Sequence, residues 1–281
     1  MKLNVVMACL LMAVVSVATV FYLQPLIDGK LITPKCSEEE TVTTWLNFYF
    51  DERTLDYLYV EEIEAYVDRS IQFSNKTLQN SCIPMERKKA SIEFVDLSGY
   101  TIFDFSTANY ALEQVLGEYI MASYEESPDQ FYILVTPPLV TNESGEEGMV
   151  TLGSAWVDIK PQFVVMDLRF SDNVLEHELG HLAWAQHDIK TFDRQEKEEL
   201  FPVRESIAMW DLPKLKSYAY GALCGDAGSV MSYEEKVLPI YSSPNITYQG
   251  EVCGNRKSAD NARLLTEYAR VLRDKVDARP W

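Results

Sequence analysis

The chain has 281 residues, 47% of them hydrophobic and 12% aromatic, a composition typical of a globular protein of one or two domains. Its 43 acidic and 25 basic residues leave a formal net charge of −18. Because an acidic surface repels phosphate groups, this balance argues against nucleic acids and anionic membranes as partners, and we expect most of the charge to be solvated.

The chain begins with an apolar run, Leu3 to Leu23, that follows Lys2. The small residues at 16–18 suit cleavage by a signal peptidase, and a run of ~20 residues also spans a bilayer if it stays uncleaved. We predict that residues 1–23 are a signal peptide or an N-terminal membrane anchor; a buried core helix is the alternative. With either a signal peptide or an anchor the rest of the chain is exported, so we expect a secreted or periplasmic location. We expect membrane contact only through the anchor.

Export also bears on the cysteines. Cys9 lies in the apolar run, and Cys36, Cys82, Cys224 and Cys253 follow it. An even number of cysteines in an exported chain predicts two disulfides, and four cysteines allow three pairings.

Residues 24–54 are predicted to be a short N-terminal extension, in which 42–50 is rich in β-formers and forms either a strand or a packing arm. From about 59 to 79 apolar residues recur with helical spacing. Residues 90–97 then alternate between apolar and polar, which predicts a strand.

Further along, Ser106 can cap a second helix that runs to about Tyr124. Apolar runs at 131–135 and 163–166 predict buried strands, and 149–157 predicts another strand between them.

A third helix is expected from its capping residues, Ser171, Asp172 or Asn173. A charged surface helix at 191–200 and a closing helix at 257–274 complete the chain. This order of helices and strands predicts one α/β domain with a mixed twisted sheet over residues 55–281.

All three histidines of the chain lie between positions 177 and 187. In an α-helix His177 and His181 point from the same face one turn apart, where their imidazoles can share a zinc ion. Glu178 follows the first histidine and can reach a water molecule bound to that ion. The spacing is that of the H-E-x-x-H zinc peptidase motif, with the glutamate as general base.

The third histidine extends this motif. His177, Glu178, His181 and His187, followed by Asp188, resemble the metzincin zinc peptidases, in particular a bacterial-type member of the reprolysin (adamalysin-like) branch. The resemblance implies that the three histidines bind one catalytic Zn²⁺ and that Glu178 is the catalytic base.

One position departs from the family pattern. Trp184 stands where metzincins have the glycine that turns the chain after the helix, so that the third histidine reaches the metal. The tryptophan implies either a strained turn or a turn built in another way.

Residues 228–233, Gly-Ser-Val-Met-Ser-Tyr, resemble the metzincin Met-turn. The resemblance implies that Met231 lies beneath the zinc ligands. Tyr233 matches a zinc-proximal, catalytic tyrosine of astacins and serralysins, and a packed aromatic is its alternative. Residues 152–156 resemble the edge strand that pairs with substrate, and 241–246 and 258–263 resemble the tail of bacterial reprolysin-like domains.

The resemblance covers roughly residues 59–281. It implies a metzincin-like α+β fold with a mixed twisted sheet, an active-site helix, a Met-turn and a C-terminal helix. It also implies a zinc-dependent endopeptidase that hydrolyses protein or peptide substrates by Glu-assisted attack of zinc-bound water.

The Met-turn also bears on the disulfides. Cys224 and Cys253 flank it, so we pair them, and Cys36 then pairs with Cys82 by default. In the alternative, Cys36 in Pro-Lys-Cys resembles the latency thiol that some metzincins place on zinc.

Two other functions remain open. A gluzincin-type peptidase would use a downstream glutamate, Glu198 or Glu199, as third ligand, against which His187 and Met231 argue. A secreted binding protein of the same fold would have no turnover, and the intact Glu178 argues against it.

Overall fold

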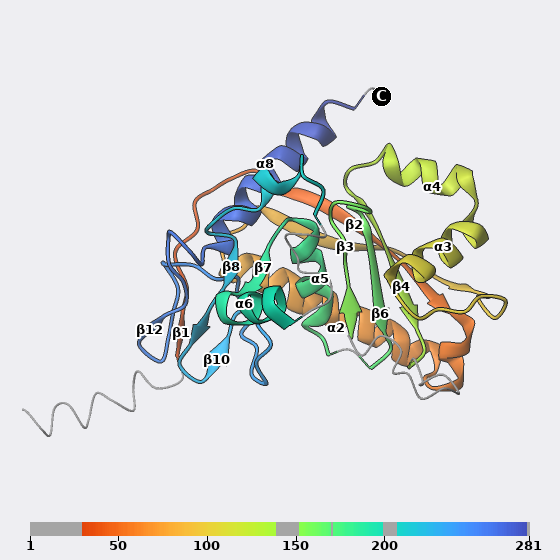
Figure 1. The fold of residues 1–281 in the computed structure, drawn as a ribbon, viewed down its shortest axis with the longest axis horizontal. Helices are drawn as coiled ribbons and strands as arrows, with labels where there is room; N and C mark the ends of the chain where they lie inside the picture. The colour runs from red at the N-terminus through yellow and green to blue at the C-terminus, as the bar shows by residue number, and fades with distance from the viewer. Residues whose placement is uncertain (1–29, 139–151, 170, 199–206, 280–281) are drawn as a thin grey trace, which may run out of the picture.

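A five-stranded sheet forms the centre of the computed structural model, which describes residues 30–138, 152–169, 171–198 and 207–279 (Figure 1). The strand order is β3-β2-β4-β6-β5. Four strands are parallel, and the short edge strand β5 is antiparallel to β6, so the predicted mixed sheet is confirmed. The strands are β2 (Val42–Asp51), β3 (Met85–Val95), β4 (Gln130–Thr136), β5 (Gly153–Ser154) and β6 (Phe163–Asp167).

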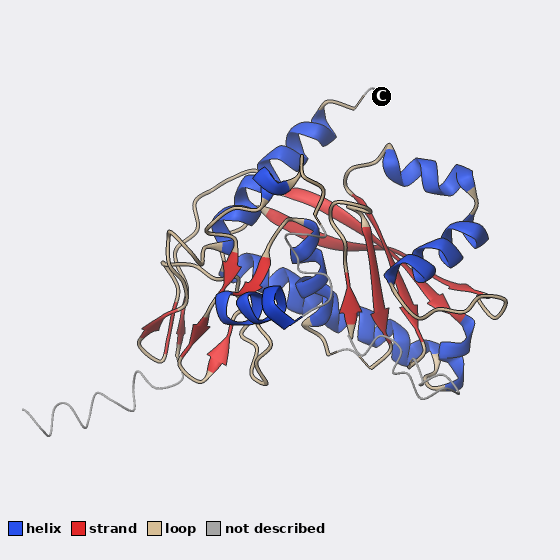
Figure 2. Ribbon diagram, in the orientation of Figure 1, coloured by secondary structure: helices blue, strands red, loops and turns tan. Residues whose placement is uncertain are grey.

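Helices cover both faces of this sheet (Figure 2). Successive side chains of a strand point to opposite faces, and the two resulting cores are separate. Leu46, Phe48 and Phe50 of β2 pack with α2 (Val60–Asn80) and α5 (Val174–Leu182). Tyr49 packs on the other face with α3 (Phe105–Leu116) and α4 (Glu118–Glu125).

The second strand belongs to the central sheet. The sequence pattern predicts a short N-terminal extension over residues 24–54, and β2 from this segment lies between β3 and β4, hydrogen-bonded to both. Its strand interpretation is confirmed. Because β2 supplies buried side chains to both faces, the sheet begins at Val42 rather than after residue 54. Residues 1–29, with the predicted signal peptide or anchor, lie outside the described residues.

The predicted helix from Ser106 to Tyr124 is two helices. Gly117 separates α3 from α4 with a φ of 80°, a conformation that glycine adopts at little cost. The N-cap is Asp104, whose carboxylate accepts a hydrogen bond from the Thr107 amide at 2.8 Å.

The C-terminal part of the chain consists of short strands, loops and a closing helix. α8 (Asn261–Asp277) packs its apolar face, Leu264, Leu265, Ala269 and Leu272, against the end of α2 and the start of β3. The remaining elements are β1 (Leu31–Ile32), the 3-10 helix η1 (Glu52–Asp56), β7 (Gln186–Asp188), α6 (Ile189–Glu198), η2 (Leu212–Lys214), β8 (Tyr220–Gly221), β9 (Leu223–Cys224), β10 (Ala227–Gly228), β11 (Thr247–Tyr248) and β12 (Glu251–Val252).

Both predicted disulfides are present. Cys36 is bonded to Cys82, and Cys224 to Cys253. The latency alternative for Cys36 is therefore wrong, because its sulfur is held in a disulfide. No helix within the described ranges combines the length and apolar character needed to cross a membrane.

A buried ion pair ties the sheet to α5. The guanidinium of Arg87 on β3 contacts both carboxylate oxygens of Glu176 at 3.2 Å, and both side chains are almost fully buried. The hydroxyl of Tyr241 donates to the same carboxylate at 2.7 Å. Burial holds the pKa of Tyr241 well above its ordinary value, so this hydroxyl stays protonated and can donate.

Replacement of Arg87 by Ala is expected to destabilise the fold by about 3–5 kcal/mol, since it leaves the Glu176 carboxylate buried without its cation. The free energy of unfolding in urea measures this loss. Lys89→Ala on the same strand is the matched control, because its ion pair with Asp68 is solvent-exposed and should contribute less than about 1 kcal/mol. Equal losses of unfolding free energy for Arg87→Ala and Lys89→Ala would contradict the stabilising role of the buried ion pair.

Candidate metal centre

The three histidines converge on one point. Nε2 of His177 lies 3.2 Å from Nε2 of His181 and 3.1 Å from Nε2 of His187, and the last two nitrogens are 3.1 Å apart. Three ligands bound to one zinc ion at ~2.0–2.1 Å form a triangle of about this size. Among the described residues, these histidines are the one group of His, Cys, Asp or Glu side chains arranged to hold a metal ion.

The hydrogen bond that Nδ1 makes in each ring determines whether the converging Nε2 can bind a metal. Nδ1 of His177 donates to the Val230 carbonyl at 2.7 Å, and Nδ1 of His181 to the Ala185 carbonyl at 2.8 Å. Nδ1 of His187 lies 2.8 Å from the Gln195 amide oxygen. With the proton on Nδ1, each Nε2 presents a lone pair. Three lone pairs at 3.1–3.2 Å repel one another unless a cation lies between them, so this donor set fits a bound zinc ion.

Burial keeps the three rings neutral. It lowers the pKa of His177 to about 4 and that of His187 to about 3, and it holds the pKa of His181 well below its ordinary value. Only the neutral imidazole is a metal ligand. The site therefore presents its ligands in the binding form at neutral pH.

The turn after α5 brings His187 to the other two histidines. Trp184 adopts a φ of 70°, the left-handed conformation that glycine takes at little cost. The Ala185 amide donates to the Gly180 carbonyl at 3.0 Å and the Trp184 amide to the His181 carbonyl at 2.8 Å, which together form a Schellman motif. The chain therefore forms the strained turn, in which the left-handed backbone of Trp184 costs ~1–3 kcal/mol. Packing of the indole, which is only 9% exposed, offsets part of it.

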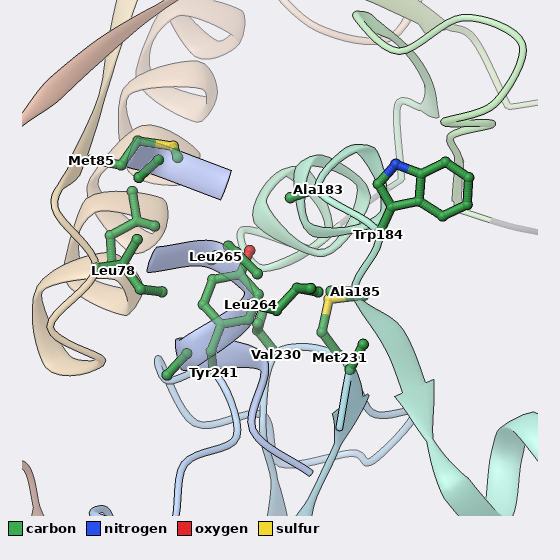
Figure 3. Close-up of a cluster of buried hydrophobic side chains, with 14 of the residues drawn as sticks. Leu78, Met85, Ala183, Trp184, Ala185, Val230, Met231, Tyr241, Leu264 and Leu265 are labelled. Atoms are coloured by element: carbon green, nitrogen blue, oxygen red, sulfur yellow. The ribbon is translucent and has the colours of Figure 1, made fainter. Parts of the chain in front are cut away.

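Met231 lies in the buried cluster that also holds Ala183, Trp184 and Ala185, which lie between His181 and His187. Its side chain is fully buried beside Ala185 and Val230 (Figure 3). A methyl group on Gly180 would lie 2.6 Å from the Met231 sulfur, so glycine is needed there for α5 to approach the turn. The adjacent Val230 carbonyl holds His177, which connects the turn directly to the metal centre.

Glu178 lies between α5 and the edge strand. Its side chain is 5% exposed, and burial raises its pKa to about 8. A cation bound by the neighbouring histidines would favour the carboxylate and lower that pKa. A methyl group on Gly153 of β5 would lie 2.7 Å from Glu178 Oε1, so the carboxylate occupies the space that a side chain there would need.

Tyr233 lies beside two of the three histidines. Its ring centroid is 4.3 Å from that of His187 and 5.7 Å from that of His177, and the side chain is 55% exposed. The structure therefore brings together His177, Glu178, His181, His187 and Tyr233. Glu199 and the side chain of Glu198, the glutamates of the gluzincin alternative, lie outside the described residues.

Sequence reasoning did not find Gln195, Arg87 or Tyr241. Gln195 is a polar residue on a charged helix, and nothing in the sequence distinguishes it from its neighbours. Arg87 and Tyr241 approach α5 from distant segments of the chain. Asp188 did carry a signal, because an aspartate before a helix is a capping residue, and its carboxylate accepts from the Thr191 amide at 3.1 Å.

No protein-family model matches the chain, and no curated protein matches it. A solved structure described as a chaperone–substrate complex matches 85% of this chain, with 12% identity and a TM-score of 0.61. This chain covers 35% of the length of that one, so the likeness concerns a part of it.

Two further solved structures are similar. Metalloproteinase-II from Bacteroides fragilis matches 87% of this chain and 60% of its own, with 15% identity and a TM-score of 0.43. Mature mirolysin from Tannerella forsythia, in complex with a cleaved peptide, matches 84% of this chain and 99% of its own, with 14% identity and a TM-score of 0.40. At these identities a likeness concerns the fold alone. The architecture itself, a mixed twisted sheet with an edge strand, the histidine helix and a closing helix, is that of the expected metzincin-like α+β fold.

Proposed function

We propose that the chain is a zinc-dependent endopeptidase of the metzincin type, similar to the reprolysin branch, that hydrolyses peptide bonds of protein substrates outside the cytoplasm. The observation that carries the proposal is the convergence of three neutral histidines at 3.1–3.2 Å, with Glu178 directly after the first of them. The two disulfides support a location outside the cytoplasm, where such bonds persist.

The chemistry follows from the residues around this centre. His177, His181 and His187 would hold the zinc ion, which supplies a Lewis acid and lowers the pKa of bound water toward ~7. Glu178 takes the proton of the attacking water and later passes it to the leaving amine, a role typically worth ~10²–10⁴-fold. Its buried position beside β5 excludes bulk water from that transfer.

Two features position the substrate. β5 is the last strand of the sheet among the described residues, and an extended peptide can pair with an edge strand of this kind. The ring of Tyr233 lies beside that of His187, which supports a role for its phenol as a donor to the oxyanion that develops on the substrate carbonyl. We propose Tyr233 as a second catalytic residue on this ground.

Zinc content measured together with casein hydrolysis tests the proposal. We expect one zinc ion per chain, hydrolysis that a chelator removes, and recovery on addition of zinc. Zinc binding without any hydrolysis would instead support the binding protein, and absence of zinc would refute both the metal centre and the peptidase.

Gly153→Ala is expected to lower kcat by about 100-fold with little change in zinc content, because the new methyl group displaces the Glu178 carboxylate. Kinetics on a fluorogenic peptide measure the effect. Gly99→Ala is the matched control, since a methyl group at Gly99 meets no atom within 4 Å. A Gly153→Ala variant with normal turnover would mean that Glu178 acts from another position.

A further inference from the structure

The third histidine reaches the metal centre from a different element than the other two. His177 and His181 lie on α5, which is fixed by both the sheet and the Met-turn, whereas His187 lies on the short strand β7. β7 follows the strained turn at Trp184 and pairs with the two-residue strand β8. The main chain therefore gives His187 less support than it gives the helical pair.

The ring of His187 is also held in a different way. His177 and His181 donate to main-chain carbonyls, which no side-chain replacement removes. His187 Nδ1 has a side-chain partner, the Gln195 amide oxygen at 2.8 Å. Gln195 thus determines both the orientation of this ring and which of its nitrogens carries the proton.

Gln195 is itself held in place by α6, the helix beside β7 in Figure 1. The Asp188 carboxylate caps the first turn of α6 through the Thr191 amide. The next residue, Phe192, is 1% exposed and packs edge-on against Tyr220 of β8, with ring centroids 5.1 Å apart. Gln195 lies three residues after Phe192 and so on the same helix face. The buried phenylalanine therefore turns the glutamine toward His187.

We propose that Gln195 is the positioning residue of the third metal ligand and that α6 braces His187 through it. This inference rests on the metal centre of the proposed function and adds a residue that determines its affinity for zinc. Without the amide oxygen, the His187 ring can rotate, and its proton can move to Nε2, the nitrogen that must bind the metal.

The zinc dissociation constant, measured by competition with a chelator, tests the proposal. Gln195→Ala should raise it by about 10–100-fold, the usual effect of losing the partner of a metal-bound histidine. Gln195→Glu should keep it close to the wild-type value, because a carboxylate also accepts the Nδ1 proton. Asp193→Ala is the matched control, an exposed residue of the same helix, and should leave zinc binding unchanged.

A second measurement distinguishes positioning from folding. In the metal-free protein, the ¹⁵N shifts of His187 report which nitrogen carries the proton, and Gln195→Ala should shift the population toward Nε2–H. The unfolding temperature of the metal-free protein should not change. Wild-type zinc affinity in Gln195→Ala, or an equal loss in Asp193→Ala, would overturn the proposal.

The outcome is separate from that of the peptidase assay. If Gln195→Ala weakens zinc binding but the wild-type protein hydrolyses no casein, the positioning role stands and the proposed peptidase function fails. If the wild-type protein hydrolyses casein and Gln195→Ala binds zinc normally, the peptidase function stands and the positioning role fails.

Discussion

Glu178→Gln should bind zinc as the wild-type protein does and lose nearly all hydrolysis. The amide keeps the shape of the side chain beside Gly153 but has no basic oxygen to take the proton of the attacking water. The expected fall in kcat is ~10²–10⁴-fold, the typical contribution of a general acid–base group. Casein hydrolysis and zinc content, measured on the same preparation, give both quantities.

Glu234→Gln is the control for this experiment. Glu234 is exposed and lies next to Tyr233, so its replacement removes a charge near the centre without removing the base. It should leave kcat within a small factor of the wild-type value. Substantial hydrolysis by Glu178→Gln would show that another group acts as the base.

His187→Ala should weaken zinc binding by roughly 10²-fold or more, a larger loss than that expected for a group that only supports a ligand. It removes one of three converging nitrogens and leaves two, whereas catalytic zinc normally takes three protein ligands. The zinc dissociation constant, measured by chelator competition, tests this expectation.

Glu198→Ala and Glu199→Ala are the controls, since these residues are the third ligands of the gluzincin alternative. Both should bind zinc nearly as tightly as the wild-type protein. If zinc affinity instead survives His187→Ala and falls on loss of one of these glutamates, the metzincin assignment is wrong and the gluzincin reading replaces it.

The metal centre could be predicted from the sequence because its signals are local. His177 and His181 are one helical turn apart, and His187 lies at the position that the metzincin motif gives to the third histidine. The effect of Trp184 could be stated only as two alternatives. Its φ of 70° shows that the chain keeps the left-handed turn with a residue that disfavours it, which spacing alone does not determine.

The supports of the centre could not be predicted, because they depend on contacts between distant segments. β2 joins the middle of the sheet by pairing with β3 and β4, and a short β-rich segment carries no sign of its neighbours. Arg87 meets Glu176 across 89 positions of sequence. Gly117 was the exception, since a glycine inside a helical pattern is a visible signal of a break that the single-helix interpretation overlooked.

The coordination of zinc by the three histidines is the central claim, and X-ray absorption at the zinc edge of the loaded protein tests it most directly. The structure predicts three imidazole nitrogens at ~2.0–2.1 Å and a remaining light-atom ligand from solvent. His187→Ala should reduce the number of imidazole ligands to two. A wild-type spectrum with only two imidazoles and a protein carboxylate, or one unaffected by His187→Ala, would contradict the account.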